Sequence, residues 1–125
     1  MIAMAVANRL RGLLGETAPV HFNFIPADEQ IAIMVDSPIP GFELDPELPG
    51  YFNDMFEVVI RHTSARLGLE LCQKAVDNLV LTNQRVGDYH FNFIRAITEP
   101  AVYPTAKSGL REFAVRFEFS CYQAI

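Results

Sequence analysis

The closing part of the chain alternates between apolar and polar residues with a period of two. Apolar residues occupy every second position from Phe113 to Cys121, and the positions between them hold Glu112, Ala114, Arg116, Glu118 and Ser120. Successive side chains of a strand point to opposite faces of its sheet, so residues 112–121 are predicted to form a strand with one core face and one wet face. On the wet face, Glu112, Arg116 and Glu118 are candidates for contact with solvent or with neighbouring molecules.

Four further segments have the composition or the alternation of strands, namely residues 20–25, 30–35, 55–61 and 89–97. The first two are separated by the turn sequence Pro26-Ala-Asp-Glu and are predicted to form a hairpin. In the segment 89–97, alternation places Tyr89, Phe91, Phe93 and Arg95 on one face. Residues 83–88, just before it, are expected to be a turn.

Two segments have helical spacing. Ile2, Val6, Leu10 and Leu13 recur at that spacing and Gly15 supplies a stop, so residues 2–14 are predicted to be a short amphipathic helix. A second helix is predicted over residues 64–80, with Thr63 or Ser64 as its cap. Its apolar face is expected to hold Ala65, Leu69, Cys72, Val76 and Leu79, and its polar face Arg66, Glu70, Gln73, Lys74 and Asp77.

These elements indicate an α+β fold: a mixed or antiparallel sheet of about five strands with two helices packed on one face. The 125 residues suffice for one domain, 1–125, with its own core. Residues 37–53 carry four prolines among apolar residues, which excludes a regular helix or a central strand. A loop of this length usually has a function or lies against another surface. A second loop is bounded by Pro100 and Pro104.

Charge is unevenly distributed along the chain. Residues 12–60 contain nine acids and no Lys or Arg, whereas eight of the ten basic residues lie from Arg61 onward. This division suits head-to-tail docking between identical subunits, and it equally suits a solvated acidic surface. The ten Phe residues likewise fit either a Phe-rich core or an apolar patch kept for a partner. With a net charge of -5, affinity for nucleic-acid phosphates is not expected.

Residues that could carry chemistry are few. His21, His62 and His90 have no acid at a diagnostic spacing and are interpreted as ordinary surface histidines rather than as a metal site or a general base. Cys72 and Cys121 fall on core faces and are interpreted as buried free thiols. We therefore expect no catalytic, cofactor-binding or metal-binding residue, and no enzyme activity. The apolar residues 1–7 are too short for a signal peptide or a membrane span, which predicts a soluble protein made in the cytoplasm.

The chain resembles the tail terminator proteins of tailed bacteriophages, also called minor capsid or tail completion proteins. The resemblance lies in the strand Met55–Arg61, the helix Ala65–Leu79, the segment Ile97-Thr-Glu-Pro100 and the closing run Arg111–Phe119. Many relatives carry an acidic residue and a Gly-Arg turn before the closing strand, where this chain has residues 106–111. Contacts made by that loop are therefore not carried over.

The resemblance implies a structural virion protein of the tail and neck that forms a homohexameric ring. Such a ring ends tail-tube polymerisation and joins the tail tube protein to a head-neck connector or stopper protein, while DNA passes through without specific binding. It has no cofactor and no membrane partner. On this basis the candidate subunit or partner contacts are Pro40, Phe42, Glu43, Asp45, Glu47, Tyr103, Lys107, Arg111 and Arg116. The acidic segment is expected to line or border the bore, because an acidic wall does not bind phosphates.

Two alternatives remain open at the level of sequence. The nearer is a head-completion or stopper protein of the same neck. The more distant is a small α+β ligand-binding domain or enzyme, which predicts a monomer or dimer with a pocket of convergent polar groups.

Overall fold

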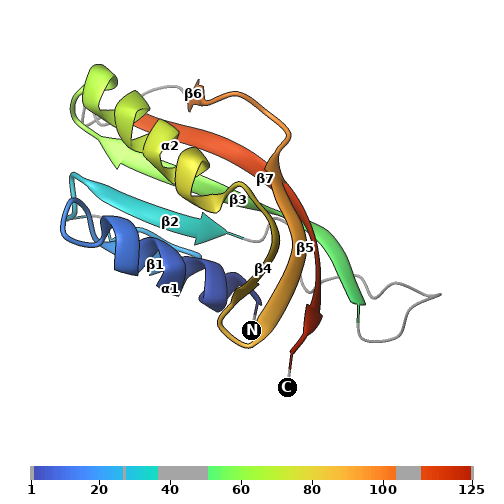
Figure 1. Cartoon of the computed structure of the whole chain (residues 1–125). Coiled ribbons are helices and arrows are strands. Elements are labelled where there is room, and N and C mark those ends of the chain that lie inside the picture. Colours follow the sequence, from blue (N-terminus) through green and yellow to red (C-terminus); the bar gives the residue numbers. More distant parts are fainter. Residues whose placement is uncertain (1, 27, 37–50, 104–110, 125) are drawn as a thin grey trace.

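The computed structural model describes residues 2–26, 28–36, 51–103 and 111–124, with the backbone alone for residues 51, 52 and 103. In chain order the elements are α1 (Ile2–Leu14), β1 (Val20–Phe22), β2 (Ala32–Asp36), β3 (Tyr51–His62), α2 (Ala65–Leu79), β4 (Leu81–Val86), β5 (Tyr89–Ala96), β6 (Ala101–Tyr103) and β7 (Arg111–Gln123). Figure 1 shows both helices on the same side of one twisted sheet. The predicted α+β class is confirmed.

The described strands form a seven-stranded sheet in the order β1-β2-β3-β7-β5-β4, and β6 pairs with β7 beyond the end of β5. Two of the seven strands were not predicted. Residues 81–86 form β4, so the turn predicted over 83–88 is wrong except at Gly87 and Asp88. The strand β6 lies in what was predicted to be loop, and β3 begins at Tyr51, inside the predicted loop 37–53.

The predicted hairpin of residues 20–25 and 30–35 is also wrong, because β1 and β2 pair in parallel. β1 has three residues, so the chain needs to return only about 10 Å to start a parallel neighbour. The segment between them, residues 23–31, is long enough to do so, and it starts with Asn23 in the left-handed region at φ 67°. The turn residues are therefore part of a crossover rather than of a tight hairpin turn.

The core lies between the sheet and the two helices and is rich in Phe. Phe113, Val115, Phe117, Phe119 and Cys121 are all buried, which confirms the predicted core face of β7. The rings of Phe56 and Phe117 stack across β3 and β7 with centroids 5.1 Å apart. Of the two alternatives left open for the Phe residues, the Phe-rich core holds for Phe56, Phe91, Phe113, Phe117 and Phe119.

Helix α2 crosses β7 at very short range. Ser64 caps the helix as predicted, since its Oγ accepts from the Leu67 amide at 3.3 Å. At Gly68 a β-carbon would come within 2.3 Å of a Phe113 ring carbon, so only glycine allows this approach. The core face of α2 is Gly68, Leu71, Cys72, Ala75 and Leu79. Leu69, predicted on that face, is 41% exposed because the helix is turned so that Gly68 faces β7.

The predicted alternation of β5 fails at one residue. The register with β7 runs Phe91 to Cys121 and then Phe93 to Ser120, so Asn92 is an extra residue, a β-bulge. The bulge shifts the alternation by one, and Phe91 and Ile94 are both buried while Phe93 lies opposite Ser120 on the other face. Asn92 donates to the Ser120 hydroxyl at 3.2 Å.

Candidate interaction surface

The face of the sheet turned away from both helices, called the outer face below, carries a set of cross-strand ion pairs. Among the described residues, Arg116 Nε lies 3.2 Å from a Glu57 carboxylate oxygen and Arg61 Nη2 lies 3.4 Å from Glu112. Arg95 and Glu118 form a third pair. In each pair the two residues are directly opposite in register, where side chains on one face are closest. The polar residues of β7 that were candidates for solvent or neighbours therefore have partners within the chain.

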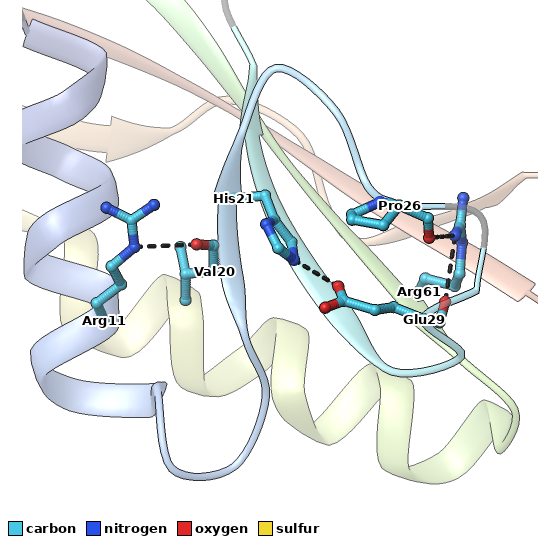
Figure 2. Close-up of polar contacts among 6 residues, drawn as sticks. All are labelled: Arg11, Val20, His21, Pro26, Glu29 and Arg61. Atoms are coloured by element: carbon cyan, nitrogen blue, oxygen red, sulfur yellow. Dashed lines mark hydrogen bonds and ion pairs between the residues drawn. The ribbon is translucent and has the colours of Figure 1, made fainter.

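The crossing segment, residues 23–31, is fixed against β3 by Arg61, as Figure 2 shows. Arg61 Nη1 donates to the carbonyl of Pro26 at 3.0 Å and to that of Glu29 at 3.2 Å. At the same end of the segment, His21 of β1 pairs with the Glu29 carboxylate. An arginine that spans two backbone carbonyls and a carboxylate uses the several donors of its guanidinium in a fixed geometry. The segment therefore has a defined shape.

The crossing segment exposes apolar side chains. Phe24 is 63% exposed, the most exposed large apolar side chain among the described residues, and Ile31 is also exposed. Asp28, between them, is exposed as well. A single exposed apolar side chain is ordinary on a protein surface, but a large aromatic ring on an anchored segment is suited to insertion into a partner.

A hollow of about 220 Å³ lies on the outer face between β3, β7 and the connection that leads into β6. It is lined by Glu57, Thr98, Ala101, Ala114 and Arg116. The Arg116 amide donates to the Thr98 hydroxyl at 3.0 Å, which holds the connection over β7 and explains why Ala114, predicted on the wet face, is buried. The hollow is smaller than the 300–1,000 Å³ of typical small-molecule sites, so it suits a protein side chain better than a cofactor.

The structure tests the position of only some predicted contact residues. Arg116 is exposed and pairs with Glu57, as described above, and Arg111 is exposed at the start of β7, opposite His62. The backbone of Tyr103 is in β6. The remaining predicted contacts, Pro40, Phe42, Glu43, Asp45, Glu47 and Lys107, lie outside the described residues.

The histidines differ from the prediction in one case. His21 is half-buried and pairs with Glu29, and His90 hydrogen-bonds Asn83 at 2.6 Å and stacks on the Tyr122 ring. His62, predicted to be on the surface, is only 8% exposed. Its Nδ1 accepts from the Ser64 amide at 2.9 Å, so the ring of this last residue of β3 is held against the N-cap of α2. The sequence signal that was missed is the short spacing from His62 to the helix cap.

Both cysteines are buried and free, which confirms the prediction. Burial away from water raises the pKa of the Cys72 and Cys121 thiols to about 12, so neither is a reactive nucleophile. Within residues 2–26, 28–36, 51–103 and 111–124, no three His, Cys, Asp or Glu side chains gather into a set that could hold a metal ion. No helix in the described part of the chain is long and apolar enough to cross a membrane.

Comparison with solved structures gives a match of fold. A chain from the virion of a native gene transfer agent particle superimposes with a TM-score of 0.73, covering 96% of this chain and 93% of that chain at 11% sequence identity. At this identity the match establishes a shared fold over nearly the whole length of both chains. No protein-family model matches the sequence. No curated protein matches it either.

Proposed function

We propose that this chain is a structural protein of a phage-like virion and that it acts as a tail terminator rather than as an enzyme. The observation that carries the proposal is the shared fold with a chain of a gene transfer agent virion over 96% of the length. The proposed assembly is a ring of identical subunits at the end of the tail tube. Its partners are the tail tube protein on one side and a head-neck connector on the other.

Two features of the described residues support an assembly role. Ion pairs and backbone hydrogen bonds fix the outer face and the crossing segment in one shape, and a rigid surface loses little conformational entropy on binding. The crossing segment also presents Phe24, and buried aromatic anchors contribute much of the binding energy in protein interfaces.

The decisive experiment is to image particles assembled without this chain. A terminator stops tube growth, so its absence is expected to give tails of abnormal length that do not join heads. Tubes of normal length with intact ends would contradict the proposal. Copurification of the chain with tail tubes is expected; copurification with DNA-filled heads in the absence of tails would instead identify a stopper protein of the neck.

The native mass of the assembled form provides a second test. Six copies of a 14.0 kDa chain give about 84 kDa, and closed rotational symmetry allows no larger species to grow. The measurement is made in the presence of tail tubes, because such a chain can remain a monomer until it meets the tube. An assembly that grows without limit, or a stable dimer on tubes, would contradict the ring.

We further propose that the acidic stretch borders the bore of the ring. Reversal of Glu43, Asp45 and Glu47 to Lys is expected to slow DNA ejection, because a basic wall binds phosphates. Unchanged ejection and assembly would remove the support for this placement while leaving the terminator proposal intact.

A further inference from the structure

A second, smaller hollow lies on the helical side of the molecule. It has a volume of about 140 Å³ and is lined by Thr17, His62, Leu67, Glu70, Leu71 and Lys74. The lining residues come from the turn after α1, the end of β3 and the first turns of α2. We call it the His62 pocket. Its volume is far below that of cofactor and drug-sized sites, so it can hold the end of one side chain.

The hydrogen bond of His62 shows which of its two ring nitrogens is left to donate. Its Nδ1 accepts from the Ser64 amide, and an accepting ring nitrogen carries no proton, so the ring proton is on Nε2. His62 Nε2 has no partner within the described residues. His62 lines the pocket, so Nε2–H is the donor that its ring can offer to a ligand there.

The charges around the pocket favour an anion. The Lys74 ammonium has no partner among the described residues, whereas the Glu70 carboxylate is engaged by Arg66 at 3.0 Å. The polar groups left for a ligand are thus the His62 N–H, the Thr17 hydroxyl and the Lys74 cation. Leu67 and Leu71 add an apolar wall, on which the methylene groups of an acidic side chain can pack.

From this geometry we infer that the His62 pocket is a socket for a carboxylate side chain of a second copy of this chain. The inference rests on the proposed ring, in which each subunit must present two different surfaces to its neighbours. Five of the six lining residues lie in residues 61–125, which carry eight of the ten basic residues, whereas residues 12–60 supply nine acids and no Lys or Arg. Two described acids of that stretch are exposed, Glu16 and Asp28. Glu16 adjoins Thr17 of the pocket in its own chain, whereas Asp28 is on the anchored crossing segment, which leaves Asp28 as the acid for a neighbouring copy.

Carbodiimide cross-linking of isotopically mixed protein tests the inference directly. The reagent activates a carboxylate as an O-acylisourea, the Lys74 amine attacks its carbonyl carbon, and an amide forms with release of a urea. In an equal mixture of ¹⁴N and ¹⁵N chains, a cross-link between Lys74 and an acid of residues 12–60 is expected in mixed-isotope pairs. Cross-links of Lys74 to Glu70 of its own chain alone would overturn the inference. The variant Lys74→Arg keeps the charge but removes the reactive amine, and it is expected to lose that cross-link.

Two leucines on the same helix give a matched pair of variants. Leu67 lines the pocket and is 40% exposed, and Leu69 lies outside it and is 41% exposed. Leu67→Asp places a carboxylate at the socket and is expected to weaken self-association at least ~10-fold, which corresponds to about 1.4 kcal/mol. Leu69→Asp, with the same charge change, is expected to have no effect. Equal effects of the two variants would overturn the inference.

The pocket chemistry is also testable without assembly. In the single chain, titration with butyrate is expected to shift the His62 imidazole NMR signals in a saturable way, whereas butylammonium is not. His90, which already bonds Asn83, is the internal control and is expected not to respond. If butyrate leaves His62 unaffected, the socket fails even if a ring of six copies forms. If butyrate binds and Lys74 cross-links in a species other than a ring, the socket holds and the proposed terminator fails.

Discussion

Strands β5 and β7 are neighbours in the sheet, and both alternate Phe with polar residues in the sequence. β7 keeps its alternation over its whole length, because β3 pairs with it without interruption from Tyr51 to His62. β5 lies between β7 and the edge strand β4, and it accepts the extra residue Asn92. The comparison shows that an alternating sequence predicts the faces of a central strand better than those of a strand near an edge, where a bulge disturbs only one well-packed neighbour.

The largest expected effect separates two Phe residues of β5 that alternation places together. Phe91 is fully buried and contacts the Phe119 ring, so Phe91→Ala should lower the free energy of unfolding by about 3–5 kcal/mol. Phe93 lies on the outer face, where the Arg95 guanidinium packs over its ring. Phe93→Ala should therefore lower the free energy of unfolding by about 1 kcal/mol or less. Urea denaturation of both variants measures the difference. Equal losses would mean that β5 has no bulge in solution.

Removal of the bulge itself should give the next largest effect. Asn83 of β4 has φ 53° and faces Asn92, and the β4–β5 register is the same on both sides of this position. Deletion of Asn92 alone would shift one half of β5 by one residue against β4. It should lower the free energy of unfolding by about 2 kcal/mol, the contribution of two backbone hydrogen bonds between strands. Deletion of both Asn83 and Asn92 keeps the strands in register and should cost less. A double deletion that is less stable than the single one would contradict this account.

The core face of β7 can be probed through Cys121. The unfolded thiol ionises near its ordinary pKa of 9.0, whereas the folded thiol stays protonated up to about 12. Between these values the unfolded state has lost a proton that the folded state keeps, so stability falls as pH rises, by about 1.4 kcal/mol at pH 10 for one thiol. The measurement is the difference in pH dependence between the wild type and Cys121→Ala, which should lack this contribution. Parallel pH profiles would show that Cys121 is accessible to water.

The smallest expected effect concerns the outer faces of the same two strands. Arg95 and Glu118 are opposite in register and form an exposed ion pair. A double-mutant cycle with Arg95→Gln and Glu118→Gln should give a coupling of about 0.5 kcal/mol, which falls further in high salt because exposed charges are screened. A coupling above about 2 kcal/mol would show that this pair is covered in solution.

The sequence predicts elements best where the core decides their pattern. The closing strand, both helices and the cap at Ser64 follow from apolar spacing and local hydrogen bonding. Strand β4 was missed because four consecutive positions, Thr82 to Arg85, are polar and exposed, as an edge strand allows. The parallel pairing of β1 and β2 was missed because the group that fixes the crossing segment, Arg61, is more than 30 residues away.

The candidate surface was less predictable than the fold, because its polar contacts depend on strand register. Arg116 was identified as a contact residue, but its partner Glu57 follows only from the pairing of β3 with β7. His62 accepts a hydrogen bond from a backbone amide two residues away. Its pocket is completed by Thr17, which comes from the turn after α1. The spacing from His62 to Ser64 hints at the bond to the helix start, but no spacing in the sequence shows that Thr17 lies beside His62.

The strands at the two ends of the described sheet have a consequence for the behaviour of the chain in solution. An open sheet edge exposes unpaired backbone groups that can recruit strands from other molecules and start aggregation. Here one end is β1, with three residues, and the other is β4, distorted by the left-handed Asn83. Neither offers a long, straight template, so edge-to-edge polymerisation through these two strands is disfavoured. Copies of this chain are then expected to associate through surface side chains, whose positions determine how the subunits are aligned and how many of them assemble.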